Sequence, residues 1–198
     1  MYQKYIKNIL DFLLALILLI LLSPLFFIIA IISKVEEPDG TVYFKQERAG
    51  MYNMPFLCYK FRSMKMTAPK NASTWELEHP EEFITPLGKF LRKTSLDELP
   101  QLINILRGEM SFVGPRPVIL KEKELLDLRA ANGAYVAKPG ITGLSQISGR
   151  DNLSPKLKAE TDGKYAENIS FINDLKILLM TIPKVLSSEG VTEGKQNF

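Results

Sequence analysis

The most hydrophobic part of the chain is a run from Ile9 to Ile32 that is apolar apart from Asp11. Its roughly 24 residues would form a helix about 36 Å long, enough to cross a bilayer. The run is too long for a signal peptide and lacks a small-residue cleavage site. Ser23 and Pro24 interrupt it near the middle, where the proline removes a backbone hydrogen bond and bends the helix. The pattern is typical of two structures: a kinked helix that spans the membrane once, and a re-entrant helix that turns at Ser23–Pro24 and leaves by the face it entered.

A second apolar pattern lies near the middle of the chain, between Leu91 and Pro117. It predicts an amphipathic helix that ends at Gly108. The apolar residues at helical spacing are Leu99, Leu102, Ile103 and Leu106. Two adjacent carboxylates, Asp97 and Glu98, would lie in the first turn, near the positive end of the helix dipole. Neighbouring residues do not share a helix face, so both acids can reach one site only at a helix end.

The two acids also have a purely structural interpretation. Ser95 and Glu98 have the spacing of a capping box. In a second register, Asp97 is the N-cap and Pro100 lies in the first turn, where proline is tolerated. A functional interpretation is favoured by the surrounding cations, which are Arg92, Lys93, Arg107 and Arg116. Two prolines fix the backbone on either side of Arg116, which suits holding one guanidinium in place.

The rest of the pattern predicts an α+β fold that is mainly helical. Residues 41–46 and 56–61 are rich in aromatic and β-branched side chains and predict a β-hairpin, with Gly50 and Asn53 in its turn. Helix signals predict further helices over residues 86–93, 118–131, from 155 onward, and 170–186, with a loop of turns over 139–150. The last helix is apolar but too short and too closely flanked by charges to span a membrane. It is typical of a buried core helix or of a helix in a membrane interface, and we favour the interface. Residues 1–34 would form the membrane helix and residues 35–198 one compact domain.

The amino-acid composition limits which partners and which kinds of catalytic site the chain can have. A chain of 198 residues suggests one domain, and its net charge of +3 is too weak to favour a nucleic-acid partner. It suits an anionic membrane surface or phosphate substrates. The single cysteine, Cys58, excludes an internal disulfide, and the single histidine, His79, excludes His-rich metal sites. Catalysis must therefore rest on carboxylates and cations.

Several segments, taken in order, resemble the bacterial monotopic phosphoglycosyl transferases. They are residues 60–64 (Lys-Phe-Arg-Ser-Met), 95–101 (Ser-Leu-Asp-Glu-Leu-Pro-Gln), 110–117 (Met-Ser-Phe-Val-Gly-Pro-Arg-Pro) and 138–143 (Lys-Pro-Gly-Ile-Thr-Gly). The resemblance covers nearly the whole chain. It implies transfer of a sugar 1-phosphate from a UDP-sugar to polyprenol (undecaprenyl) phosphate, with release of UMP, as the first membrane step of glycoconjugate assembly. It also implies a compact catalytic domain with interfacial amphipathic helices.

The resemblance assigns roles to the polar residues. Asp97 would be the nucleophile that forms a phosphosugar–aspartyl intermediate, and Glu98 would hold Mg²⁺ or assist proton transfer, with both acids available to the metal. Arg92 and Arg116 would bind phosphate, with Lys60 and Arg62 behind them.

Arg150, next to Gly149, would reach the uridine or its phosphate. The chain departs from the common family pattern nearby. Residues 144–146 read Leu-Ser-Gln where Trp-Ala-Gln is frequent, and Asp151 stands where Asn is frequent.

Charge alone does not fix the topology. Lys4 and Lys7 precede the apolar run, and the positive-inside rule alone would place the bulk of the chain outside the cell. Nucleotide sugars are cytoplasmic, however, and a re-entrant helix reconciles a basic entry with a cytoplasmic body. We therefore expect a monotopic protein on the cytoplasmic face of the bacterial inner membrane, in contact with lipids and with downstream glycosyltransferases as further partners. Two alternatives remain: a membrane-anchored, Mg²⁺-dependent nucleotide-sugar hydrolase, and a non-enzymatic membrane-anchored interaction module.

Overall fold

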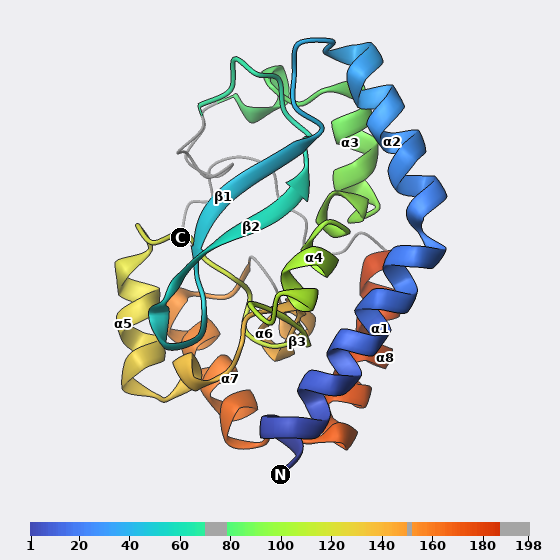
Figure 1. Cartoon of the computed structure of the whole chain (residues 1–198). Helices are drawn as coiled ribbons and strands as arrows, with labels where there is room; N and C mark the ends of the chain where they lie inside the picture. The colour runs from blue at the N-terminus through green and yellow to red at the C-terminus, as the bar shows by residue number, and fades with distance from the viewer. Residues whose placement is uncertain (70–78, 150–151, 187–198) are drawn as a thin grey trace.

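The computed structural model of the chain describes residues 1–69, 79–149 and 152–186. Helices dominate, and the strands are few and short (Figure 1). The α-helices are α1 (Lys7–Leu21), α2 (Ser23–Glu36), α3 (Pro86–Lys93), α4 (Gln101–Leu106), α5 (Lys123–Ala131), α6 (Leu144–Ser148), α7 (Pro155–Glu167) and α8 (Phe171–Leu186). The strands are β1 (Tyr43–Ala49), β2 (Pro55–Phe61), β3 (Ser111–Val113) and β4 (Gly140–Thr142). Short helical turns are η1 (Tyr2–Ile6), η2 (Met51–Asn53), η4 (Pro80–Glu82), η5 (Leu96–Glu98) and η6 (Ala134–Val136). The predicted mainly helical α+β fold is confirmed.

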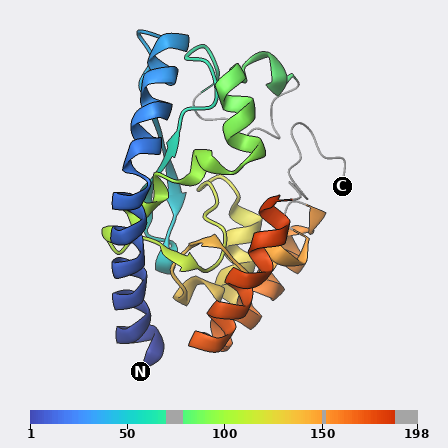
Figure 2. The same ribbon diagram turned by 90° about the vertical axis from the view of Figure 1, so that its right-hand side faces the viewer.

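The apolar run forms two helices that meet at a bend of 60°. The break falls where the sequence predicts it: Leu22 leaves helical geometry, the Ser23 hydroxyl donates to the Ile20 carbonyl at 2.8 Å, and Pro24 lies in the first turn of α2. Figure 2 shows the pair running along one edge of the molecule. In the described part of the chain no single helix is long and apolar enough to cross a membrane, whereas this bent pair, taken together, reaches that length and composition.

Helix α1 packs along α4 and buries one narrow face. Lys7, Asp11 and Ala15 recur every four residues on this face and are at most 9% exposed. The Lys7 ammonium lies 2.6 Å from Oδ2 of Asp174 on α8, so a buried ion pair joins the two ends of the described chain. The rest of α1 presents large apolar side chains to the surface, among them Ile9, Leu13, Ile17 and Ile20.

The hairpin is confirmed. Strands β1 and β2 pair antiparallel from Tyr43 opposite Phe61 to Ala49 opposite Pro55. The turn between them contains Gly50 and the left-handed Asn53, as expected for turn residues.

A second, parallel pair of strands, β3 and β4, was not predicted. Residues 139–150, expected to be a loop of turns, contain β4 and helix α6 within their described part. Three-residue strands are too short to show a periodicity. The two strands approach closely at Gly114, where an added Cβ would lie 2.1 Å from the Lys138 carbonyl oxygen, so only glycine fits. The core around β3 includes Leu102, Ile105, Met110, Val113, Tyr165 and Ile177.

The prediction of one helix that begins at the acidic pair is wrong. Helix α3 ends at Lys93, the acids lie in the separate turn η5, and α4 begins only at Gln101. Ser95 adopts a left-handed conformation (φ 56°) that reverses the chain after α3, and its side chain caps nothing, so the capping box is absent. Pro100, not Asp97, precedes the first residue of α4.

Two other helix starts follow the sequence closely. The Thr85 hydroxyl accepts from the Gly88 amide at the start of α3, and the Ser154 hydroxyl accepts from the Leu157 amide at the start of α7. Helix α5 begins at Lys123, five residues later than predicted, and ends before the left-handed Gly133 as expected.

Candidate active site

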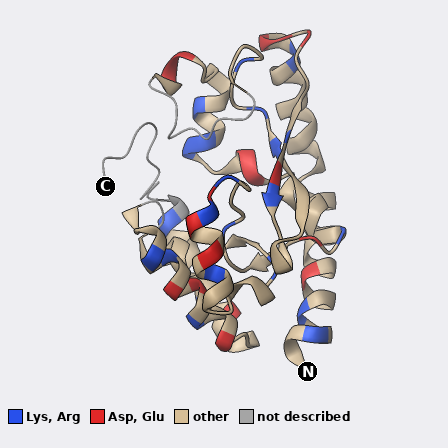
Figure 3. Ribbon diagram, turned by 90° about the vertical axis from the view of Figure 1, so that its left-hand side faces the viewer, with Lys and Arg blue, Asp and Glu red and all other residues tan. Residues whose placement is uncertain are grey.

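The acidic pair lies between α3 and α4 and faces strand β2. The left-handed Ser95 turns the chain, and the Glu98 amide donates to the Ser95 carbonyl to close the turn η5. Figure 3 shows an acidic turn near the centre of the molecule with basic segments on both sides of it. We predicted that a helix end would present both acids to one site. In the structure the short turn η5 presents them instead.

Glu98 is held by two cations from different parts of the chain. Its Oε1 accepts from the Lys60 ammonium at 2.8 Å and from Nη1 of Arg116 at 3.3 Å. Lys60 comes from β2 and Arg116 from the segment that follows β3, whereas Glu98 itself is 8% exposed. The structure therefore brings together three of the predicted site residues.

Asp97 has a different environment. It is partly exposed, and within the described chain its carboxylate takes part in no hydrogen bond or ion pair. Removal from water raises its pKa above the ordinary aspartate range; Lys60 opposes this rise and the charge of Glu98 adds to it. The two acids of the pair therefore differ in their contacts.

Arg92 completes the group of predicted cations around the acids. It lies in the last turn of α3, its Nε donates to the Ser63 hydroxyl at 2.9 Å, and its charge, like that of Arg116, acts to lower the pKa of Asp97. Lys60, Arg92 and Arg116 carry three positive charges against two negative ones, so the site has a surplus that suits an anionic substrate.

Arg62, a predicted substrate-binding residue, has its contacts away from the acidic pair. Arg62 pairs with Glu37 at 3.7 Å and contacts Thr41 and Met66, which ties the end of β2 to the exit of α2. Its role in phosphate binding stays a prediction. Arg150 lies outside the described residues.

Sequence reasoning missed two arginines near the site. Arg48 on β1 donates to the Pro117 carbonyl at 3.4 Å and to Oε1 of Gln46 at 2.5 Å. Burial and the neighbouring Arg116 lower its pKa. Arg129 on α5 donates to the Arg116 carbonyl at 3.0 Å. Neither belongs to a segment that carries the family resemblance, so only the folded chain reveals them.

The donor set of the acids fits Mg²⁺, which favours oxygen ligands and is commonly held by one or two carboxylates together with substrate phosphates. Asp97 offers a carboxylate with no partner in the described chain, and Glu98 lies beside it. Among the described residues no group of three or more His, Cys, Asp or Glu side chains is placed to hold a metal by itself. A metal held by the two acids would take its remaining ligands from outside this pair.

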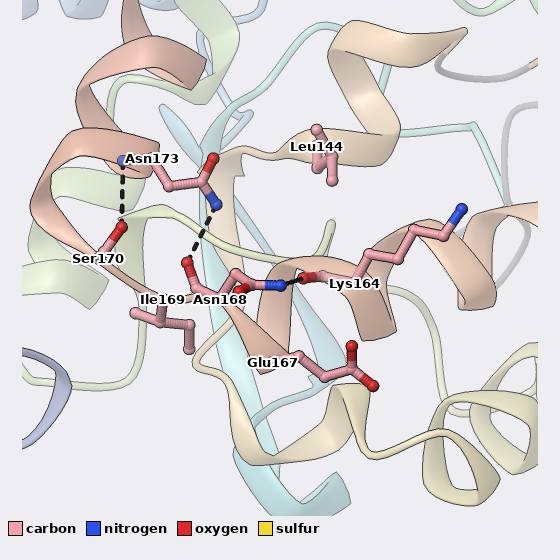
Figure 4. A pocket seen from close by; sticks show the side chains of 7 residues that line it. All are labelled: Leu144, Lys164, Glu167, Asn168, Ile169, Ser170 and Asn173. Carbon is pink, nitrogen blue, oxygen red and sulfur yellow. Dashed lines mark hydrogen bonds between the residues drawn. The ribbon is translucent and has the colours of Figure 1, made fainter.

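A pocket of about 590 Å³ lies elsewhere, between α6, α7 and α8 (Figure 4). Its lining residues are Leu144, Lys164, Glu167, Asn168, Ile169, Ser170 and Asn173. None of them is a predicted catalytic or phosphate-binding residue. The acidic pair, rather than this pocket, is therefore the candidate site.

The chain is similar in sequence to several known proteins. The family model described as "Bacterial sugar transferase" matches residues 2–188. The chain is 42% identical to the uncharacterized sugar transferase EpsL of Bacillus subtilis, over 95% of this chain and 91% of that protein. It is 39% identical to the exopolysaccharide production protein ExoY of Sinorhizobium fredii, over 93% and 87% of the two chains. It is 37% identical to the undecaprenyl-phosphate galactose phosphotransferase of Salmonella typhimurium, over 95% of this chain and 42% of that longer protein.

Proposed function

The chain belongs to the bacterial sugar transferase family, and from this premise we propose that it transfers a sugar 1-phosphate from a UDP-sugar to polyprenol phosphate. The products would be UMP and a polyprenyl diphosphate sugar. The printed name of the Salmonella relative supports the general reaction, because that protein is described as an undecaprenyl-phosphate galactose phosphotransferase. The sugar of the present enzyme is left to a panel of UDP-sugars assayed for UMP release.

We propose a covalent mechanism with Asp97 as nucleophile. A carboxylate oxygen of Asp97 attacks the phosphorus that bears the sugar, the bond from that phosphorus to the bridging oxygen breaks, and UMP leaves with the bonding electrons. A phosphate oxygen of polyprenol phosphate then attacks the same phosphorus and expels Asp97 as a carboxylate. The observation that carries this proposal is the contrast within the pair. Glu98 binds Lys60 and Arg116, whereas the Asp97 carboxylate makes no hydrogen bond or ion pair among the described residues and lies within the field of the same cations.

The cations explain how one anion can attack another. Lys60, Arg92 and Arg116 would neutralise the diphosphate and stabilise the charge on the transferred group and on the departing UMP. Splitting the transfer into two steps lets the same cations serve both substrates in turn. Mg²⁺ bound by Asp97 or Glu98 would add positive charge to the phosphates.

We also propose that the enzyme is monotopic on the cytoplasmic face of the bacterial inner membrane, with α1 and α2 forming a re-entrant helix. The support is the bend at Leu22–Ser23 and the large apolar side chains that α1, α2 and α8 leave on the surface. On α2 they include Phe27, Ile28 and Ile31, and on α8 Phe171, Ile172, Leu175 and Leu179. A lipid-linked acceptor requires the site to meet the membrane. Glycosyltransferases that extend the product would be partners at the same surface.

The direct test mixes enzyme, Mg²⁺ and UDP-sugar without an acceptor. We expect one equivalent of UMP and a mass increase of one phosphosugar on Asp97, located by intact-protein and peptide mass spectrometry. Continuous UMP release without polyprenol phosphate would identify a hydrolase instead. No turnover of any UDP-sugar, with or without acceptor, would identify a non-enzymatic interaction module. If an active enzyme never shows the adduct in a rapid-quench series, the two substrates react in a ternary complex.

A further inference from the structure

The backbone that carries Arg116 is held at almost every carbonyl. Five of the six carbonyl groups between Val113 and Val118 accept a hydrogen bond from outside the segment. Their donors are the Tyr165 hydroxyl to Val113 (2.9 Å), the Gly140 amide to Pro115 (2.9 Å), Arg129 to Arg116 (3.0 Å), Arg48 to Pro117 (3.4 Å) and the Ala49 amide to Val118 (2.9 Å). We propose that this clamp is part of the catalytic apparatus and that Arg129 is its positioning residue, acting on the substrate through Arg116.

The Arg129 guanidinium is fixed before it reaches Arg116. It is 6% exposed, and its Nε and Nη2 donate to Oδ2 of Asp162 at 2.9 and 2.6 Å. Asp162, on α7, is 1% exposed, and its second oxygen accepts from the Ser145 hydroxyl at 2.7 Å. Three elements, α5, α6 and α7, thus converge on one ion pair whose remaining donor, Nη1, points to the Arg116 carbonyl.

A contribution to folding stability does not by itself explain the buried ion pair of Arg129 and Asp162. Two charges buried together lose their hydration, and a well-packed hydrophobic pair of similar volume is usually as stable or more so. What the ion pair supplies is geometry, because the planar guanidinium binds Asp162 along one edge and the Arg116 carbonyl with the other. Lysine has a single ammonium on a flexible stem and cannot span both partners in this way.

Holding the Arg116 backbone in place also positions the Arg116 side chain. Its side chain reaches Oε1 of Glu98 at 3.3 Å, in the group of charges around Asp97. This inference rests on the proposed function, in which that guanidinium binds substrate phosphate. A displacement of about 1 Å at such a group can lower a rate roughly a hundredfold. Loss of the clamp should therefore weaken catalysis through Arg116 and through nothing else.

A double-mutant cycle tests this in the full-length protein. Arg129→Lys keeps the charge beside Asp162, and we expect it to lower sugar-phosphate transfer at least about tenfold. In an Arg116→Lys background the same change should lower transfer less than about threefold, because the clamp no longer has a guanidinium to position. Asp162→Asn, which keeps the shape of the side chain but frees the guanidinium, is the second variant and should follow the same pattern. Effects that multiply in the double mutants would overturn the positioning role.

Amide hydrogen exchange gives a readout that does not depend on activity. Arg129→Lys should speed exchange at Ala49, Gly114 and Gly140, whose amides form the backbone hydrogen bonds of the clamp, and leave the rest of the β1–β2 hairpin unchanged. Unchanged exchange across these amides overturns the clamp, whatever the activity. Wild-type protein without any transfer activity would instead refute the proposed function, and the clamp is then judged by exchange alone.

Discussion

The ammonium group of Lys60 donates a 2.8 Å hydrogen bond to Oε1 of Glu98, the same oxygen that accepts from Arg116 at 3.3 Å. One carboxylate is thus shared by two cations. Substrate phosphates would compete with Glu98 for these cations.

This competition predicts the behaviour of Glu98→Gln. Without the negative charge, Lys60 and Arg116 attract the diphosphate more strongly, so KM for the UDP-sugar should fall. Turnover should fall as well, by about 10- to 100-fold, because hydrogen bonds to a charged group contribute roughly 1.5–3 kcal/mol. The phosphosugar adduct should still form on Asp97. Steady-state UMP release and mass spectrometry measure the two effects, and a variant that folds but never forms the adduct would make Glu98, not Asp97 alone, essential for attack.

Lys60 itself can be tested against a lysine of the same hairpin. Lys60→Met removes a cation that binds Glu98 and should lower kcat/KM by about 10- to 100-fold. Lys45, on β1, lies over the Tyr59 ring at 5.2 Å and has no part in the proposed site. Lys45→Met is therefore the matched control, expected to change kcat/KM less than about threefold. Equal losses in the two variants would show a general charge effect rather than a site at Lys60.

The raised pKa of Asp97 predicts a pH dependence with two opposite shifts. The nucleophile must be ionised, so transfer should rise with pH through the pKa of Asp97, at a higher pH than for an ordinary aspartate. Lys60→Met removes a charge that lowers this pKa, so the acidic limb should move to higher pH. Glu98→Gln removes a charge that raises it, so the limb should move to lower pH. Profiles of single-turnover adduct formation against pH measure both, and shifts of the same sign in the two variants would contradict the assignment of the limb to Asp97.

The sequence predicted the residues of the candidate site more accurately than it predicted the secondary structure of the backbone around them. Lys60, Arg116 and Glu98 do converge, and the break at Ser23–Pro24 falls where the proline indicates it. The helix over the acids was wrong because helical spacing from Leu99 to Leu106 says nothing of where a helix begins, and the left-handed Ser95 has no signal in the pattern.

The parts of the site that could not be predicted depend on long-range contacts. Arg129 and Asp162 are 33 positions apart, and nothing local marks them as partners. Strands β3 and β4 have three residues each and pair only because Gly114 and Gly140 allow close approach. Such features arise from tertiary packing, which a single sequence does not encode in its periodicity.

Asn104 is a second residue that only the structure reveals, and it predicts a stability effect. It is fully buried on α4, accepts from the Tyr59 amide at 3.0 Å and donates to the Leu57 carbonyl at 2.7 Å, which ties the helix to β2. Asn104→Ala leaves both backbone groups without a partner and should cost about 2–5 kcal/mol. Asn152→Ala, at an exposed position, should stay within about 0.5 kcal/mol of the parent. Denaturant unfolding in detergent measures both, and a small effect of Asn104→Ala would mean that water replaces the lost bonds.

The topology of the bent helix pair in the membrane can be tested by labelling. If α1 and α2 form a re-entrant helix, then the amino terminus and the body of the protein lie on the same side. Gln3 and Lys156 are exposed and report on the two segments, and Cys58 is 2% exposed, so Cys58→Ser removes a background thiol of low reactivity. In that background we expect Gln3→Cys and Lys156→Cys to react with a membrane-impermeant maleimide from the same side of sealed vesicles.

A variant without the bend between α1 and α2 is the matched comparison for this labelling experiment. Ser23→Leu with Pro24→Leu restores the backbone donor at position 24 and removes the side chain that bonds the Ile20 carbonyl, so the run should straighten into a helix long enough to span. In this variant Gln3→Cys and Lys156→Cys should label from opposite faces. Labelling from opposite faces already in the parent would refute the re-entrant topology and leave the kinked single span. The same result in parent and variant would show that packing of α1 on α4, rather than the bend, decides the topology.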